Sequence, residues 1–149
     1  MFGMEMKDMK AGFFDRAPII QAVDKATRQV LSKFGAFVRT AARSSIRKRK
    51  RISDPNQPPS SHMGLLKQFI YFAYEPGSQN VVIGPVRLGS KSGEAPASLE
   101  YGGPNTVTTV RRGKKTTNRV QIAARPFMHP AFEQEKAKLP ALWANSVRN

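Results

Sequence analysis

The sequence predicts an α+β protein, with a long N-terminal helix and a C-terminal helix packed on a small antiparallel sheet that has projecting hairpin loops. Three patterns predict it: a helical apolar repeat that begins at Pro18, two strand–turn–strand patterns within residues 65–125, and a second helical stripe after Pro130. The chain has 149 residues, the length of one ordinary domain. We therefore expect a single domain over residues 1–149.

The first helix is expected over residues 18–51, after a leader of residues 1–17. Proline suits the first turn of a helix, and apolar residues follow Pro18 at helical spacing: Ile20, Val23, Val30, Phe34, Phe37 and Ala41. Basic residues then continue to the predicted end of the helix. They are favoured there because cations stabilise the negative end of the helix dipole.

The first of two hairpins is expected to join a strand at residues 65–74 to one at residues 80–84. The turn between them is Glu75-Pro76-Gly77-Ser78. Side chains alternate between the two faces of a strand. Three apolar side chains therefore share the face that a helix would cover: Ile70, Phe72 and Tyr74.

The second hairpin is expected to join strands at residues 106–110 and 118–123. Its tip, Arg111-Arg112-Gly113-Lys114-Lys115, is basic and contains glycine, so it should project into solvent or onto a partner. The last helix is expected over residues 130–147, where Pro140 should kink it or split it in two.

The charge of the chain is large and unevenly placed. Lys and Arg number 25 against 10 Asp and Glu, a net charge of +15. Residues 39–51 contain seven bases and no acid, and residues 87–125 have a net charge of +6. This pattern predicts a nearly neutral scaffold with basic surfaces that contact a polyanion or an acidic protein. The candidate contact residues are Arg39, Arg43, Arg47, Lys48, Arg49, Lys50, Arg51, Arg111, Arg112, Lys114 and Lys115.

Several function classes are not expected. The chain has no cysteine, which removes disulfides and thiolate metal sites. Its two histidines, His62 and His129, are far apart in sequence and lie in no catalytic motif, and no phosphate-binding glycine loop is present. No apolar run is long enough for a membrane span, and Glu5 and Asp8 interrupt the region where a signal peptide would be apolar. We therefore predict no catalytic, metal or cofactor-binding residues and a soluble protein.

Three motifs occur in a fixed order along the chain. A passage of Pro, short polar residues and Gly-Leu-Leu-Lys occupies residues 58–67, Leu99-Glu100-Tyr101-Gly102 follows, and residues 124–132 contain Arg-Pro-Phe and then Pro-Ala. Over residues 18–147 the chain thereby resembles the HK-ninety-seven gene-ten-like tail-component family of long-tailed bacteriophages, the neck or tail-completion type. The motif residues are Gly64, Leu65, Glu100, Tyr101, Gly102, Arg125, Pro126, Phe127 and Pro130.

The resemblance implies a structural virion protein without enzymatic activity. It implies a homo-oligomeric ring, hexameric or dodecameric, that connects capsid and tail at the head–tail junction after assembly in the cytoplasm of a host bacterium. Its partners would be other neck proteins, namely the connector or head-closure ring and the tail-terminator ring. The basic residues would then face either the DNA channel or acidic surfaces of adjoining rings.

Two other functions remain open from the residues alone. The basic segments also suit a nucleic-acid-binding module of the ribosome-associated type, which would bind as a monomer with strong salt dependence. A small basic ribonuclease of the toxin type would need a general base near a phosphate-binding cation, and His62 and His129 are poor candidates for that role.

Overall fold

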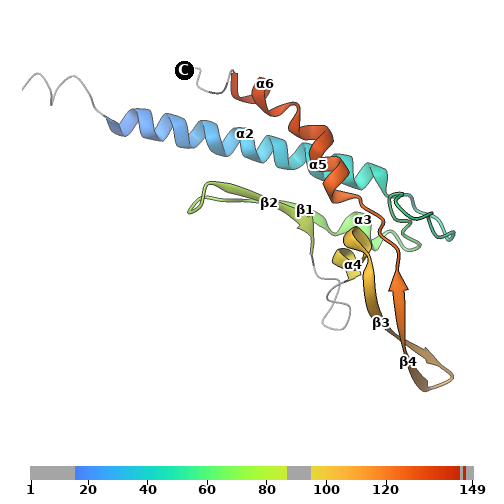
Figure 1. The fold of residues 1–149 in the computed structure, drawn as a ribbon. Helices are drawn as coiled ribbons and strands as arrows, with labels where there is room; N and C mark the ends of the chain where they lie inside the picture. Colours follow the sequence, from blue (N-terminus) through green and yellow to red (C-terminus); the bar gives the residue numbers. More distant parts are fainter. Residues whose placement is uncertain (1–15, 87–94, 145, 147–149) are drawn as a thin grey trace, which may run out of the picture.

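A single helix of 30 residues, α2 (Arg16–Ser45), runs along the whole body of the protein (Figure 1). The computed structural model describes residues 16–86, 95–144 and 146. None of the helices in these ranges is long and apolar enough to cross a membrane. The remaining helices are short: α3 (Leu65–Gln68), α4 (Ala95–Tyr101), α5 (Met128–Lys136) and α6 (Leu139–Ala144).

The strands form two separate antiparallel hairpins. In the first, β1 (Ile70–Glu75) pairs with β2 (Asn80–Pro85), and in the second, β3 (Gly103–Arg111) pairs with β4 (Lys114–Ile122). The first hairpin lies along α2, whereas the second projects away from the body (Figure 1). The predicted α+β class is confirmed. The expected single sheet is instead two two-stranded sheets, with α4 between them in the chain.

The core lies where α2, the first hairpin and α5 meet. Five buried residues of α2 recur every four positions: Ala26, Val30, Phe34, Val38 and Ala42. Of these, Phe34, Val38 and Ala42 belong to one core cluster with residues of β1, the chain entering α5 and α5 itself, namely Ile70, Phe127 and Ala131. The prediction is correct for the centre of the apolar stripe, but the first members of the stripe, Ile20 and Val23, are exposed.

Gly35 lets α2 approach the first hairpin closely. A Cβ atom at this position would lie 2.8 Å from Cδ2 of Phe72 and 2.9 Å from Cγ2 of Val81. These distances are shorter than real carbon–carbon contacts, so only glycine fits without rearrangement. Glycine lowers the helix propensity of α2 at this position, but it allows α2 to pack closely on the first hairpin.

The first helix is shorter than predicted. It ends at Ser45 rather than residue 51, and residues 47–51 follow it outside any helix. Ser44 and Ser45 donate their hydroxyls to the carbonyls of Ala41 and Ala42, each at 2.8 Å. Serine side chains compete in this way with the backbone, and the five consecutive cations after them repel one another.

Two further boundaries differ from the predictions. Residues 65–68 form α3 instead of starting the strand, because Gly64 turns the chain at φ 80° and its carbonyl accepts from the amide of Gln68 at 3.0 Å. The C-terminal helix begins at Met128 and is split before Leu139, as expected from Pro140, which suits the first turn of α6. Of the predicted leader, residues 1–15 lie outside the described residues.

Candidate functional site

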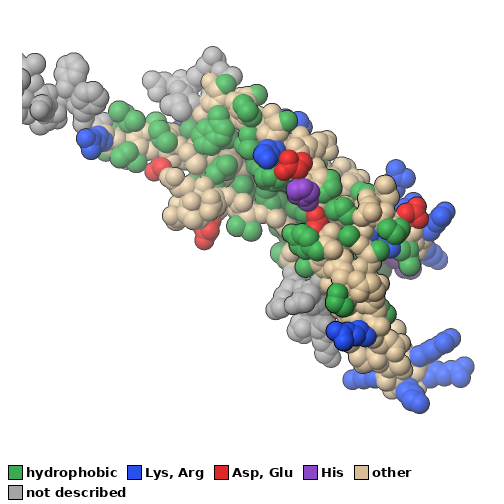
Figure 2. All heavy atoms as spheres, in the orientation of Figure 1, with side chains coloured by type: hydrophobic (Ala, Val, Ile, Leu, Met, Phe, Trp, Pro, Cys, Tyr) green, Lys and Arg blue, Asp and Glu red, His purple; other side chains and the backbone are tan. Residues whose placement is uncertain are grey.

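The basic residues predicted to contact a partner lie in two clusters. The loop cluster is the run that follows α2, and the tip cluster is at the end of the second hairpin (Figure 2). All of their side chains are exposed. In the described ranges, the ion pairs are Lys136–Glu133 and Lys138–Glu135, so no member of either cluster is neutralised by a described acid. The clusters comprise Arg47, Lys48, Arg49, Lys50 and Arg51, and Arg111, Arg112, Lys114 and Lys115.

The loop cluster lies on a backbone that is held in place. The carbonyl of Arg47 accepts from the amide of Ser61 at 3.0 Å, and Arg47 and Ser60 form a parallel β-bridge. Nε of Arg49 donates to Oγ of Ser60 at 2.8 Å, which leaves the outer guanidinium nitrogens available. Pro59 beside this bridge is fully buried. The cations are therefore presented by a fixed loop.

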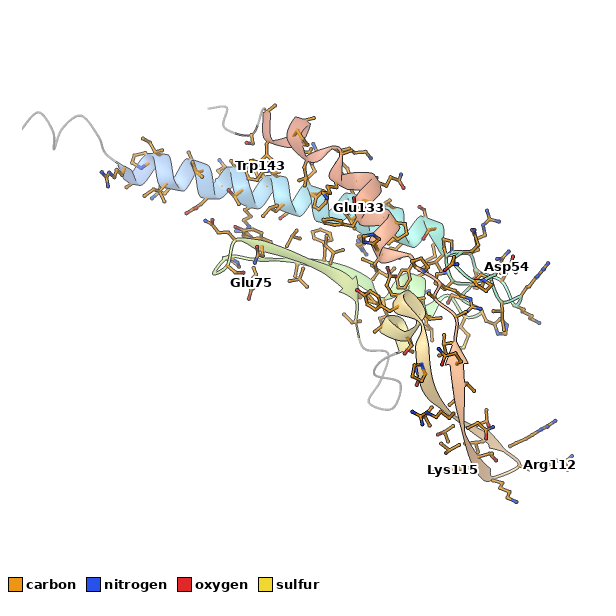
Figure 3. The ribbon with its side chains drawn as sticks, viewed as in Figure 1. Asp54, Glu75, Arg112, Lys115, Glu133 and Trp143 are labelled. Atoms are coloured by element: carbon orange, nitrogen blue, oxygen red, sulfur yellow. The ribbon has the colours of Figure 1, made fainter. Side chains whose placement is uncertain are left out.

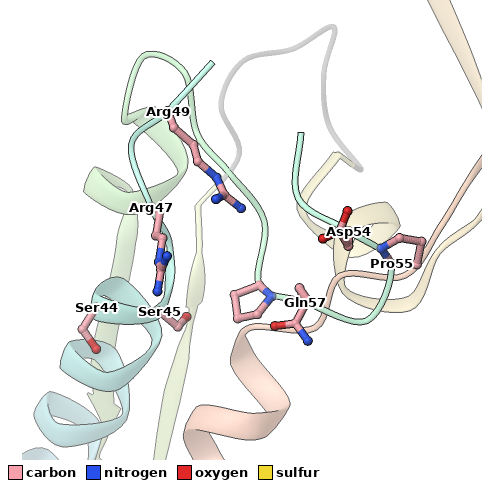
Figure 4. Close-up of a pocket in the computed structure, with 8 residues that line it drawn as sticks. Ser44, Ser45, Arg47, Arg49, Asp54, Pro55 and Gln57 are labelled. Carbon is pink, nitrogen blue, oxygen red and sulfur yellow. The ribbon is translucent and has the colours of Figure 1, made fainter. Parts of the chain in front are cut away.

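A cavity of about 580 Å³ lies beside the loop cluster (Figure 4). Arg47 and Arg49 line it, together with Asp54 and Gln57 from the proline-rich loop. Serine hydroxyls at its wall are already hydrogen-bonded to helix carbonyls. Its two cations and one carboxylate favour an anion, which guanidinium groups hold by charge-assisted hydrogen bonds.

The tip cluster surrounds a tight two-residue turn. Arg111 and Lys114 form the last pair of the ladder, and the turn residues Arg112 and Gly113 have φ of 51° and 78°. Positive φ at both positions is the type I′ turn that matches the twist of a hairpin. Figure 3 shows Arg112 and Lys115 pointing away from the protein at the end of this hairpin. The turn thus presents four cations in a small space.

Arg39 and Arg43 are placed differently from the two clusters. Nε of Arg39 donates to the carbonyl of Ile70 at 2.9 Å, and its guanidinium lies 5.7 Å from the ring centroid of Tyr71. Arg39 therefore joins α2 to β1. Arg43 is half-buried in the last turn of α2. Their predicted contact with a partner stays a prediction.

Glu100 has a structural task at the start of α5. Its Oε2 accepts from the amides of Phe127 at 2.9 Å and Met128 at 3.0 Å, and its Oε1 accepts from the amide of His129 at 2.8 Å. These amides are among the donors that a helix leaves unpaired at its N-terminus. A carboxylate there is also favoured by the helix dipole. Glu100 is nearly buried, and it fastens α4 to α5.

The chain entering α5 also anchors the second hairpin. Gly102 has φ of 72°, and a Cβ atom there would lie 2.8 Å from the amide nitrogen of Ala124. Nε of Arg125 donates to the carbonyl of Ser53 at 3.0 Å, and the amide of Asn56 donates to the carbonyl of Ala124 at 2.8 Å. These contacts fix the base of the hairpin beside the loop that follows α2.

The remaining motif residues are structural or exposed. Phe127 is buried in the core, Pro130 lies in the first turn of α5, and Gly64 is the left-handed residue before α3. Leu65 is exposed, and Tyr101 is 82% exposed. Pro126 is half-buried, in the segment without regular structure that precedes α5.

Arg119 is a cation that the sequence interpretation did not include among the candidate residues. It is exposed on β4, opposite Thr106, and shares a ribbon face with Lys115. Its position in the predicted strand at 118–123 is the signal that could have identified it, because an exposed cation on a strand beside a basic tip extends the same surface.

Comparison with protein-family models, curated proteins and solved structures gave no match to this chain. The phage neck family therefore remains an expectation from the motifs.

Proposed function

We propose that this protein is a non-enzymatic structural component of a bacteriophage virion, where copies of it form a ring at the head–tail junction around the DNA channel. The observation that supports it best is the second hairpin, which has almost no cover from the described part of the chain. Every side chain from Thr106 to Gln121 is exposed, including Val110 at 64%. The motifs that resemble those of phage neck proteins support the same place of action.

An isolated two-stranded hairpin is at best marginally stable in water. Here each strand has nine residues, and no other strand in the described ranges pairs with the outer edge of either one. Natural proteins cover such edges or use them for association. In a ring, contact between this hairpin and neighbouring subunits would cover the outer edges of both strands.

The other end of the molecule also has uncovered apolar surface. Ile19 and Ile20 are more than half exposed on the part of α2 that extends beyond the first hairpin (Figure 1). The hairpin tip lies at the opposite end of the elongated molecule. Two different surfaces at opposite ends suit a head-to-tail contact, which closes into a ring when the rotation between subunits allows it.

Assembly tests this proposal directly. Native mass spectrometry and negative-stain electron microscopy of the purified protein, alone and mixed with the proteins of neighbouring genes, should show closed rings. A protein that stays monomeric in every one of these mixtures would refute the proposal.

One specific observation favours a second candidate, a monomeric nucleic-acid-binding module of the ribosome-associated type. It is the lack of any described acid paired with either basic cluster. This function would predict nucleic-acid binding by a monomer together with no ring in the same mixtures. The two candidates therefore differ in assembly, whatever the outcome of a binding measurement.

A further inference from the structure

The two basic clusters lie at the base and at the tip of the second hairpin. The base of the second hairpin is fastened to the loop after α2 through Asn56 and Arg125, and the loop cluster directly precedes these contacts. The tip cluster is at the far end of the same hairpin. Figure 2 shows cations gathered at both places, on the same side of the view.

The length of the hairpin gives the distance from its base, beside the loop cluster, to the tip cluster. The strand β4 spans nine residues, Lys114–Ile122. At the rise of a strand this corresponds to about 30 Å. One helical turn of B-form DNA is about 34 Å long. A duplex lying along the hairpin would therefore present phosphates on the same side to both clusters.

The chemistry of the hairpin fits a nucleic acid better than an acidic protein. Residues 103–122 contain no acid, and all five of their charged side chains are cations, which is the charge that contact with phosphates requires. Behind the tip the two strands contain five Thr and two Asn, whose side chains donate to phosphates and sugars. A two-stranded ribbon also has the width that the major groove of DNA admits.

Both faces of the ribbon have cations near the tip. The pairing register puts Lys115 and Arg119 on one face, and Arg111 and Lys114 on the other. Either face of the ribbon can therefore contact a phosphate backbone. This suits binding that does not read the base sequence.

We propose that the loop cluster and the tip cluster together bind one DNA duplex, at phosphates about one helical turn apart and without regard to base sequence. This inference rests on the proposed function only for the identity of the duplex, which would be the viral genome at the head–tail junction. The contact itself belongs to the single subunit and can be measured apart from ring assembly.

The test is fluorescence anisotropy with labelled duplexes of about 24 and about 8 base pairs, which are longer and shorter than one helical turn. The tip variant is Arg111→Gln, Arg112→Asn, Lys114→Gln and Lys115→Gln, in which Asn suits the positive φ of the turn. The loop variant is Lys48→Gln, Arg49→Gln, Lys50→Gln and Arg51→Gln. A matched control removes four exposed cations from α2: Arg16→Gln, Lys25→Gln, Arg28→Gln and Lys33→Gln.

On the long duplex, each cluster variant should bind more weakly than the wild type, and the slope of log K against log salt should become less steep by about 3.6. Between 50 and 200 mM salt the wild type then loses about 150-fold more affinity than either variant. On the short duplex, which cannot reach both clusters, the three proteins should agree within about twofold. The α2 control should keep the wild-type slope.

Four outcomes would overturn the inference. An equal loss of slope in the α2 control would make binding a matter of net charge alone. If the tip variant lost as much affinity for the short duplex as for the long one, the two clusters would not bind one duplex. Tighter binding of poly-glutamate than of the long duplex, at equal charge concentration, would assign the clusters to an acidic protein. Rings that still form while duplex binding is absent would overturn this inference and leave the proposed function intact.

Discussion

Replacing Glu100 with alanine should destabilise the protein more than the loss of any exposed acid. The substitution removes three hydrogen bonds from a carboxylate to the start of α5. The amide of Phe127 belongs to a buried residue, and an unsatisfied buried donor costs about 1–3 kcal/mol. Water can reach the other two amides more easily, and the lost dipole interaction adds about 0.5–1 kcal/mol. We expect a decrease of about 3 kcal/mol in the free energy of unfolding.

The assay is thermal unfolding followed by circular dichroism at a fixed protein concentration, because assembly would make the midpoint depend on concentration. A loss of about 3 kcal/mol lowers Tm by about 6–12 °C for a domain of this size. Glu100→Gln keeps one acceptor oxygen and should lose about half as much. The control is Glu133→Gln, an exposed acid on α5 whose ion pair with Lys136 at 3.6 Å is solvated. A Glu100→Ala protein as stable as this control would refute the assigned role.

Two glycine substitutions probe the packing of the scaffold. Gly35→Ala should lower the free energy of unfolding by about 1–2 kcal/mol, because the new methyl group would overlap the ring of Phe72 and only part of this cost is offset by better helix propensity. Gly102→Ala should cost at least about 2 kcal/mol, because it combines a positive φ with backbone atoms of Ala124 in the way. Both are measured by chemical denaturation.

The matched control for these glycines is Gly77→Ala, in the turn of the first hairpin. Its Cβ atom would meet nothing within 4 Å, and its φ is not in the left-handed region. Its stability should stay within about 0.5 kcal/mol of the wild type. Gly35→Ala or Gly102→Ala proteins that match this control would contradict the packing described here.

Local patterns predicted most elements of the fold. Alternation along β1 predicted that Ile70 and Phe72 face the helix, and the structure buries Ile70 fully and Phe72 in part. The basic tip between two polar strands predicted a projecting hairpin. In each case the information lies within a few residues, at a period set by the element itself.

The errors occurred where contacts distant in sequence decide the structure. Residues 47–51 continue a helical pattern, yet the segment leaves the helix and pairs with Ser60 and Ser61. Ile20 has the helical spacing of a core residue, but no other described element reaches far enough along α2 to bury it. The hydrogen bonds of Glu100 to α5 connect positions 27 to 29 residues apart, so no local pattern could predict them.

The same distant contacts give the basic clusters their relation to each other. Arg125 donates its amide to the carbonyl of Leu99 and its side chain to Ser53, while Asn56 donates to Ala124. These bonds tie both strands of the second hairpin and the loop after α2 to one joint. The direction of the hairpin is therefore fixed by backbone hydrogen bonds and not by the cations themselves. These hydrogen bonds hold the hairpin in place against the repulsion between the like charges of the two clusters. The two clusters therefore keep a set spacing, which is what the binding of one extended polyanion requires.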